Sequence, residues 1–156
     1  MFPVVTNLRT GGRVTTTLQP KTYTAASTNG ASHQSDGEKD DFVVSLGAWT
    51  DGTQTITFQA APDNNGAAGT WAAIAAADLE ADDGVLSSGT VVISDNTRAG
   101  QTFVISYHGG KPWLRANIAD AGGTTGSEVC VLVTTLNRRY VGANNPGATT
   151  SYSTSD

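Results

Sequence analysis

The residues that could supply a nucleophile, a base or a metal ligand are few in this chain. It has two histidines, His33 and His108, and a single cysteine, Cys130. His33 lies in a polar stretch of small residues and His108 stands beside a Gly-Gly turn, so neither is expected on a rigid element with a partner. Cys130 lies between two valines, where a small buried hydrophobic side chain is a more ordinary interpretation than a reactive thiolate. We therefore predict no catalytic residue and no enzymatic activity.

The acidic run at residues 36–41 is similar to a calcium-binding loop only in its alternate carboxylates. Counted from Asp36, the sixth position is Asp41 rather than glycine, and the twelfth is Gly47 rather than a bidentate glutamate. One cysteine forms neither an internal disulfide nor a multi-cysteine metal site. Phosphate-loop, dinucleotide and zinc-protease motifs do not occur in the sequence. The sequence therefore predicts no metal site and no cofactor.

Tryptophan and arginine point to binding rather than to chemistry. Trp49, Trp71 and Trp113 each stand near a turn signal, and Arg115 follows Trp113 by two residues. Residues two apart share one face of a strand, so Trp113 and Arg115 point the same way. Such a pair on an outer face is typical of a protein contact, while a solvated arginine lying over an indole is the ordinary alternative. Two or more tryptophans exposed on one face would instead form a sugar-binding platform.

The segments that would position these residues show the alternation of β-strands. Apolar side chains recur at every second residue in the runs 42–46, 53–59, 103–107, 114–118 and 129–133. Glycine-rich turn signals separate the runs, and we expect hairpins at residues 50–52 and 107–113. A strand at 70–74 is expected to precede a short helical turn at 75–79. The pattern predicts an all-β fold, an antiparallel β-sandwich or barrel of about seven to eight short strands.

The two ends of the chain are more polar than its middle. Residues 1–41 are predicted to form an extended N-terminal arm or long loop, residues 42–141 the β-sandwich or barrel body, and residues 142–156 a flexible C-terminal tail. Residues 14–24 have the composition of a strand that could pair with the sheet edge of a neighbouring molecule. We expect Arg138, Arg139 and Tyr140, at the end of the body, to finish the last strand or to contact a partner.

Composition and charge exclude several classes of protein. Only 15% of residues are charged, and the chain is rich in threonine, which is unlike a helical bundle or coiled coil. No apolar window approaches the ~20 residues that a membrane span requires, and no secretory signal is visible, so we expect no membrane partner. The net charge of −5 is concentrated in the acids of residues 36–95, which argues against nucleic acid as a partner.

The order of motifs in the body resembles the small head decoration proteins, or capsid cement proteins, of tailed bacteriophages. The resemblance lies in FVVSLGAWTDGT at residues 42–53, the turn at 63–66 ahead of Thr70 and Trp71, the pair at 78–79, and YHGGKPWLR at 107–115, with Arg138 and Arg139 closing the pattern. It covers about residues 42–140. The loop at 60–69 is longer than in that pattern, and the N-terminal 40 or so residues are not part of it.

The resemblance implies a non-enzymatic structural protein that binds the outer surface of an assembled capsid and stabilises it. The implied partners are the major capsid protein and further copies of this chain, on the exterior of a virion head, after synthesis in the host cytoplasm. Trp113, Arg115, Arg138, Arg139 and Tyr140 are the candidate interface residues. A tail or baseplate component and a carbohydrate-binding β-sandwich module remain the alternatives. A small hydrolase is disfavoured because no pair of base and nucleophile can be named.

Overall fold

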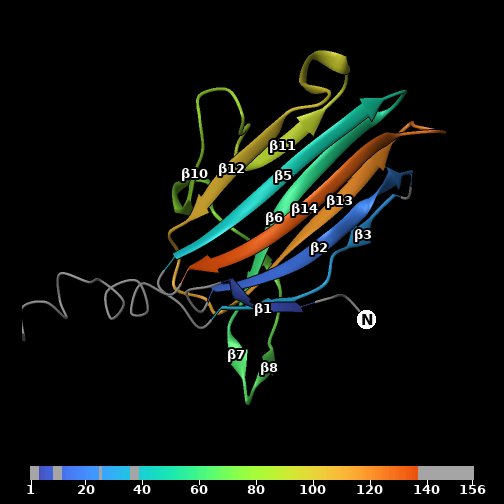
Figure 1. Ribbon diagram of the computed structural model, residues 1–156. Helices are drawn as coiled ribbons and strands as arrows, with labels where there is room; N and C mark the ends of the chain where they lie inside the picture. The colour runs from blue at the N-terminus through green and yellow to red at the C-terminus, as the bar shows by residue number, and fades with distance from the viewer. Residues whose placement is uncertain (1–3, 9–11, 25, 36–38, 137–156) are drawn as a thin grey trace, which may run out of the picture.

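The chain folds into two antiparallel β-sheets that enclose a hydrophobic core (Figure 1). The computed structural model describes residues 4–8, 12–24, 26–35 and 39–136. The predicted all-β antiparallel fold is confirmed, and the helical structure in these residues is confined to two short 3-10 turns, η1 (Ala76–Asp78) and η2 (Asn96–Arg98). The first of these turns falls within the helical turn expected at residues 75–79.

Sheet A contains the longest strands and sheet B lies against it (Figure 1). In spatial order, sheet A is β1 (Val4–Leu8), β2 (Gly12–Tyr23), β14 (Ser127–Leu136), β5 (Lys39–Trp49), β12 (Thr102–Tyr107) and β10 (Leu79–Glu80). Sheet B is β11 (Thr90–Ile93), β6 (Thr53–Ala61), β13 (Trp113–Ala121) and β3 (Thr28–Asn29), with β4 (His33–Gln34) also on β13 and β9 (Ala72–Ala73) also on β6. The hairpin of β7 (Asp63–Asn64) and β8 (Ala67–Ala68) projects beyond the sheets.

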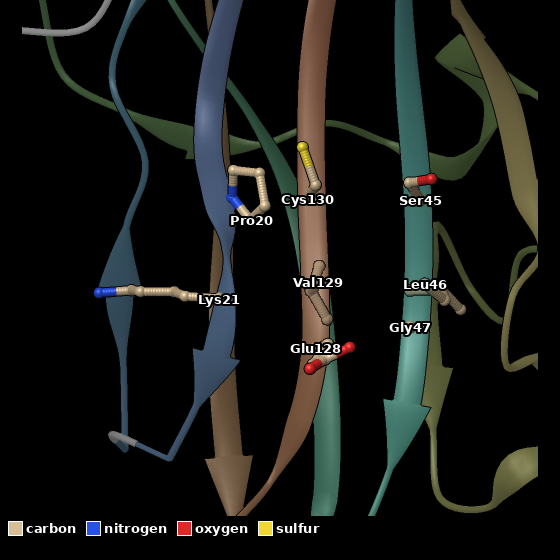
Figure 2. A pocket seen from close by; sticks show the side chains of 8 residues that line it. All are labelled: Pro20, Lys21, Ser45, Leu46, Gly47, Glu128, Val129 and Cys130. Carbon is tan, nitrogen blue, oxygen red and sulfur yellow. The ribbon is translucent and has the colours of Figure 1, made fainter.

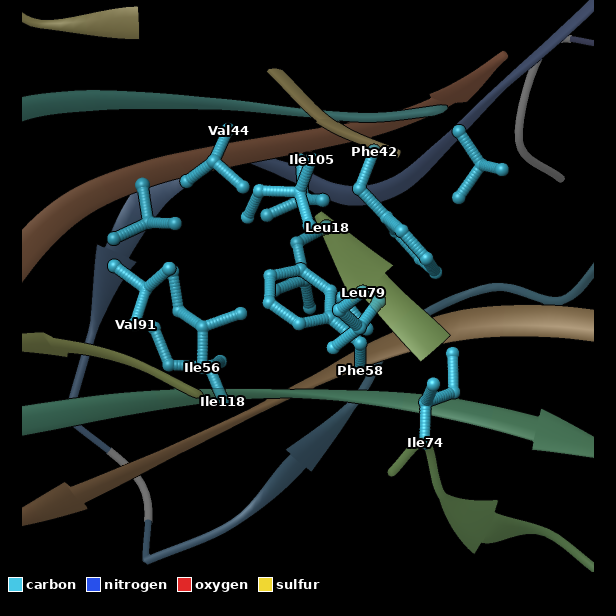
Figure 3. Close-up of a cluster of buried hydrophobic side chains, with 14 of the residues drawn as sticks. Leu18, Phe42, Val44, Ile56, Phe58, Ile74, Leu79, Val91, Ile105 and Ile118 are labelled. Atoms are coloured by element: carbon cyan, nitrogen blue, oxygen red, sulfur yellow. The ribbon is translucent and has the colours of Figure 1, made fainter. Parts of the chain in front are cut away.

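The core lies between the sheets, and its members follow the predicted period of two. Along β5, Phe42, Val44 and Leu46 are buried, whereas their neighbours point outward. Phe42 from sheet A meets Phe58 from sheet B with ring centroids 4.7 Å apart and planes tilted by 52°. Figure 3 shows this pair among the aliphatic side chains of both sheets. The two rings therefore join the sheets at the centre of the core.

The two predicted hairpins are wrong, because both turns lead from one sheet to the other. β5 and β12 belong to sheet A, while β6 and β13, which follow them in the chain, belong to sheet B. The turn from β13 to β14 returns to sheet A in the same way. A glycine with positive φ, such as Gly52 at 77°, permits a tight reversal in either direction. The burial of each strand's apolar face, rather than the turn residues, decides which sheet the next strand joins.

The prediction that residues 1–41 form an arm or long loop is also wrong for the greater part of that segment. β2 lies within sheet A between β1 and β14, and β3 and β4 pair with β13 in sheet B. Leu18 and Tyr23 are 1% and 4% exposed and belong to the core. The body of the fold therefore begins at or before Gly12 rather than at Phe42, and the strand imagined for a neighbour's sheet edge is paired within its own chain. The tail expected at 142–156 lies outside the described residues.

Buried threonines hide from sequence analysis that β2 belongs to the body of the fold. Thr15 and Thr17 point inward and are 2% and 1% exposed. The Thr17 hydroxyl oxygen accepts a hydrogen bond from the backbone N–H of Ala116 at 3.0 Å, across to sheet B. A buried hydroxyl with such a partner is tolerated where an unpaired one would be costly. The inward face of β2 thus contains polar residues that a hydropathy pattern assigns to solvent.

Asp51, in the turn after β5, holds the loop between β13 and β14. Its carboxylate accepts hydrogen bonds from the hydroxyl of Thr124 at 2.6 Å and from the backbone N–H groups of Thr124, Thr125 and Gly126 at 3.0, 2.9 and 2.7 Å. The Thr124 hydroxyl and these N–H groups stabilise the charged form, and they hold the pKa of Asp51 well below its usual range. Two turns that each pass between the sheets are therefore linked by one side chain.

We expect Asp51→Asn to lower the melting temperature by a few degrees at pH 7. Because the pKa is lower in the folded state, the charged carboxylate stabilises the fold above the unfolded value of about 4. That contribution is lost as the pH falls through the folded pKa, so wild type and variant should converge in acid. Thermal melts between pH 7 and pH 2 measure this, with Asp83→Asn as the control that removes an equal charge from an exposed turn. A difference in melting temperature between wild type and Asp51→Asn that stays the same at every pH would contradict the role of Asp51.

Candidate binding face

The outer face of sheet B brings tryptophan and arginine together. On β13, Leu114 and Ala116 are fully buried, so Trp113 and Arg115 point away from the core and are half-buried. Arg115 lies opposite Gln59 on β6 in the antiparallel register. The structure thus places Trp113 and Arg115 on one face, as the period of two predicts. We call Gln59, Trp71, Trp113 and Arg115 the Trp–Arg face.

Arg115 stacks on Trp71 rather than on its strand neighbour. Its guanidinium carbon lies 4.3 Å from the centroid of the Trp71 ring. Its Nε donates a hydrogen bond to Oε1 of Gln59 at 2.7 Å. Partial burial lowers the pKa of the Arg115 guanidinium below its ordinary value, but an arginine remains charged at neutral pH. The plane and one edge of the guanidinium are therefore fixed by residues from two other segments.

Trp113 anchors the β7–β8 hairpin to the same face. Its indole Nε1 donates to Oδ1 of Asp63 at 2.9 Å, and the other carboxylate oxygen of Asp63 accepts from the N–H of Gly66 at 3.1 Å. The bond from Trp113 and then the one from Gly66 lower the pKa of Asp63. Trp49 lies elsewhere, at the end of β5, and its indole donates to the carbonyl oxygen of Gly52 at 3.0 Å. Two of the three tryptophans therefore contribute to the Trp–Arg face.

Sequence reasoning missed Trp71 and Gln59 as partners of Arg115. Gln59 lies beside Arg115 because of the register in which β6 pairs with β13. The alternation of two strands in the sequence does not reveal the register between them. Trp71 reaches the face because β9, immediately after it, pairs with β6 on the side opposite β13. No local signal reports that pairing. The remaining predicted interface residues, Arg138, Arg139 and Tyr140, lie outside the described residues.

His33 has partners that the sequence did not suggest. It is 1% exposed, with Nδ1 2.9 Å from Oγ1 of Thr15 and Nε2 2.6 Å from Oγ1 of Thr135. The Thr135 hydroxyl donates in turn to Oδ1 of Asp40, which lies 4.0 Å from His33 Nε2. The expectation that His33 lies on no rigid element and has no partner is wrong. It is a buried core histidine that ties β4 to three strands of sheet A.

This buried cluster has the residue types of nucleophilic catalysis but not the access. Thr135 is 1% exposed and Asp40 is 7% exposed, so a substrate cannot reach the hydroxyl without unfolding of the strands around it. Its hydrogen bonds instead satisfy polar groups inside the sandwich. His108 is exposed and lies 2.8 Å from a carboxylate oxygen of Glu80, a surface pair of the kind that contributes little stability.

A shallow pocket of about 380 Å³ lies on sheet A, over β2, β14 and β5 (Figure 2). It is lined by Pro20, Lys21, Ser45, Leu46, Gly47, Glu128, Val129 and Cys130. Cys130 is half-buried on this side of β14 rather than in the core, and burial raises the pKa of its thiol. A raised thiol pKa favours the protonated form, which is the weaker nucleophile. Cys130 is therefore not an activated nucleophile in this pocket.

Neither metal-binding nor membrane-spanning features emerge from the part of the chain that is described. In those residues, no three His, Cys, Asp or Glu side chains gather closely enough to hold a metal ion. None of the helices there is long and apolar enough to cross a membrane.

Comparisons with protein-family models, with curated proteins and with solved structures found no match.

Proposed function

We propose that this chain is a non-enzymatic structural protein of a phage virion that binds the outer surface of the assembled capsid and stabilises the shell. In this proposal the major capsid protein is its partner, further copies of the chain surround it on the head exterior, and it is made in the host cytoplasm. The resemblance of residues 42–140 to capsid decoration proteins supports the proposal.

The observation that carries the proposal is the Trp–Arg face itself. Tryptophan and arginine are the residue types most enriched at the energetic centres of protein interfaces. Here they are held in place before binding, because Arg115 is stacked on Trp71 and bonded to Gln59. A side chain already ordered loses less conformational entropy on association. The face is therefore suited to binding another protein surface.

Two of the motifs that carry the family resemblance meet at this face, the turn at 63–66 with Trp71 after it and the motif at 107–115. The turn at 63–66 supplies the carboxylate that binds Trp113, and the motif at 107–115 supplies Trp113 and Arg115 themselves. Trp71, which follows that turn in the sequence, supplies the ring under Arg115. Segments that are about 40 residues apart in the chain thus meet at one surface, which supports a shared role in binding.

Repetition of the capsid surface would strengthen a contact of modest size. Several copies of one site bound to a lattice gain avidity, because later contacts form at a high effective concentration. A rigid sandwich transmits load between neighbouring subunits better than a flexible linker does. A chain of this kind stabilises a shell by adding contacts that exist only when the shell is assembled.

We expect Trp71→Ala to weaken binding to capsids by about 30-fold, as for a central interface residue worth about 2 kcal/mol. Cosedimentation of the purified chain with capsids assembled without it measures the occupancy. Val104→Ala is the matched control, since Val104 is 55% exposed on sheet A, the sheet opposite the Trp–Arg face. Circular dichroism verifies that both variants are folded. No cosedimentation of the wild-type chain would exclude the proposal.

The position of Trp71 and Trp113 on one face favours a second candidate, a carbohydrate-binding module. Indole rings stack on sugars, and an amide side chain such as that of Gln59 can bind hydroxyl groups. Arg115 already lies over the Trp71 ring, which leaves less ring surface for a sugar. Binding to a glycan array without binding to capsids would favour this candidate. Binding to purified tails instead of heads would favour a tail or baseplate component.

A further inference from the structure

We infer that Arg115 recognises a carboxylate side chain of the partner protein, through the two terminal nitrogens of its guanidinium. The inference rests on the proposed function and names the chemistry that the capsid surface must present to the Trp–Arg face.

The terminal nitrogens of Arg115 are available to bind a partner. Nε is bonded to Gln59 and the guanidinium plane lies against Trp71. Among the residues at 4–8, 12–24, 26–35 and 39–136, neither Nη1 nor Nη2 of Arg115 has a hydrogen-bond acceptor or an ion-pair partner. The four N–H donors of the terminal nitrogens therefore have no acceptor among the described residues, on a guanidinium whose orientation is already fixed.

The shape of the guanidinium favours a partner group with two acceptor atoms. The two terminal nitrogens form a planar fork with parallel N–H bonds, and the two oxygens of a carboxylate match that fork. A backbone carbonyl or a hydroxyl offers one acceptor atom and leaves the other nitrogen unpaired. Since Nε is occupied by Gln59, the carboxylate must approach end-on rather than along the Nε edge.

The positive charge of Arg115 also restricts the chemistry of the partner group. Asp63, the acid bonded to Trp113, has each of its carboxylate oxygens engaged, one by Trp113 and the other by Gly66. These neutral donors leave Asp63 charged, but among the described residues no Asp or Glu forms an ion pair with Arg115. A partner that covered the guanidinium without supplying a counter-ion would bury an unpaired charge, which is costly. A phosphate would also fit the fork, but the net charge of −5 repels a polyanion such as nucleic acid. An aspartate or glutamate of the capsid protein is the counter-ion that the geometry favours.

The experiment compares two substitutions of Arg115 in cosedimentation with capsids. Arg115→Met keeps much of the side-chain length but removes the charge and the donors, and we expect it to bind about 30-fold more weakly or worse. Arg115→Lys keeps the charge but loses the bidentate fork and the flat stack, and we expect an intermediate loss of about tenfold. Gln59→Leu, which frees Nε and loosens the orientation, is expected to cost several-fold. Melting temperatures within a few degrees of wild type show that the variants are folded.

A crosslinking arm identifies the partner group directly. A carbodiimide joins an amine to a carboxylate as an amide with no spacer, so the new amine of the Arg115→Lys variant can be coupled only to a carboxylate in direct contact with it. We expect mass spectrometry of the crosslinked capsid to find position 115 joined to an aspartate or glutamate of the capsid protein. The Val104→Lys variant, with its new amine on sheet A, is the control and should not crosslink to that residue.

The outcomes separate the inference from the proposed function. Wild-type binding together with unchanged binding of Arg115→Met overturns the carboxylate inference and leaves capsid binding standing. Binding of Arg115→Lys without a crosslink from position 115 overturns it as well. A wild-type chain that does not cosediment overturns the proposed function, and the inference falls with it. Loss of binding in Arg115→Met with a crosslink from position 115 supports both.

Discussion

A chain lacking residues 1–35 is expected not to fold. The deletion removes β1 and β2 from the side of sheet A next to β14, and it removes β3 and β4 from β13. Leu18 and Tyr23 leave the core, and their loss exposes the inner face of sheet A to water. It also removes Thr15 and His33, the partners of the buried Thr135 hydroxyl network. Unsatisfied buried polar groups and lost apolar contacts together exceed the stability of an ordinary domain.

Circular dichroism and thermal melting of the truncated chain measure this result. We expect no cooperative transition. Two single substitutions on β2 give reference values for this loss of stability. Leu18→Ala should lower the free energy of unfolding by about 2–5 kcal/mol. Thr22→Ala, at an exposed position, should lower it by less than about 0.5 kcal/mol. A truncated chain that melts cooperatively at the wild-type temperature would restore the view of this segment as an arm.

We expect Phe58→Ala to lower the free energy of unfolding by about 3–5 kcal/mol. Phe58 is fully buried on sheet B, and its ring lies 4.7 Å from that of Phe42 on sheet A. Truncation removes the aromatic contact and leaves a cavity between two sheets that cannot close over it without moving. The loss is a large fraction of the about 5–15 kcal/mol by which domains are stable.

Urea denaturation at equilibrium measures the effect of Phe58→Ala. Val104→Ala is again the control, because more than half of that side chain is exposed and its truncation should change stability by less than about 0.5 kcal/mol. Equal midpoints for the two variants would show that the sheets are not joined through Phe58.

The strands of the body could be predicted from sequence because their inward residues are apolar. β5, β6, β13 and β14 each alternate, and the residues expected to point inward do so. The partners of these strands could not be predicted in the same way. A reversal such as the one at Gly52 looks alike in sequence whether the next strand lies beside the first or across the core from it. Both expected hairpins were wrong for that reason.

The place of β2 and β4 within the body could not be predicted, because their inward faces are partly polar. Thr15, Thr17 and His33 are buried through hydrogen bonds to each other or to strands far away in the sequence. Nothing in a hydropathy pattern distinguishes a threonine with such a partner from one in solvent. The candidate site likewise has one part that the sequence pattern predicts and one part that depends on long-range pairing. The common face of Trp113 and Arg115 follows from the period of two, whereas the stack on Trp71 depends on where β9 pairs.

The position of β14 has a consequence for synthesis. β14 is the last strand in the described chain, yet it lies in the middle of sheet A between β2 and β5. The ribosome delivers a chain from its N-terminus, so β2 and β5 emerge long before the strand that joins them. In a nascent chain that ends before Ser127, β2 and β5 lack the strand that pairs with both of them. Sheet A therefore cannot be completed until residues 127–136 have left the ribosome, and a product terminated before Ser127 lacks the strand that joins β2 to β5.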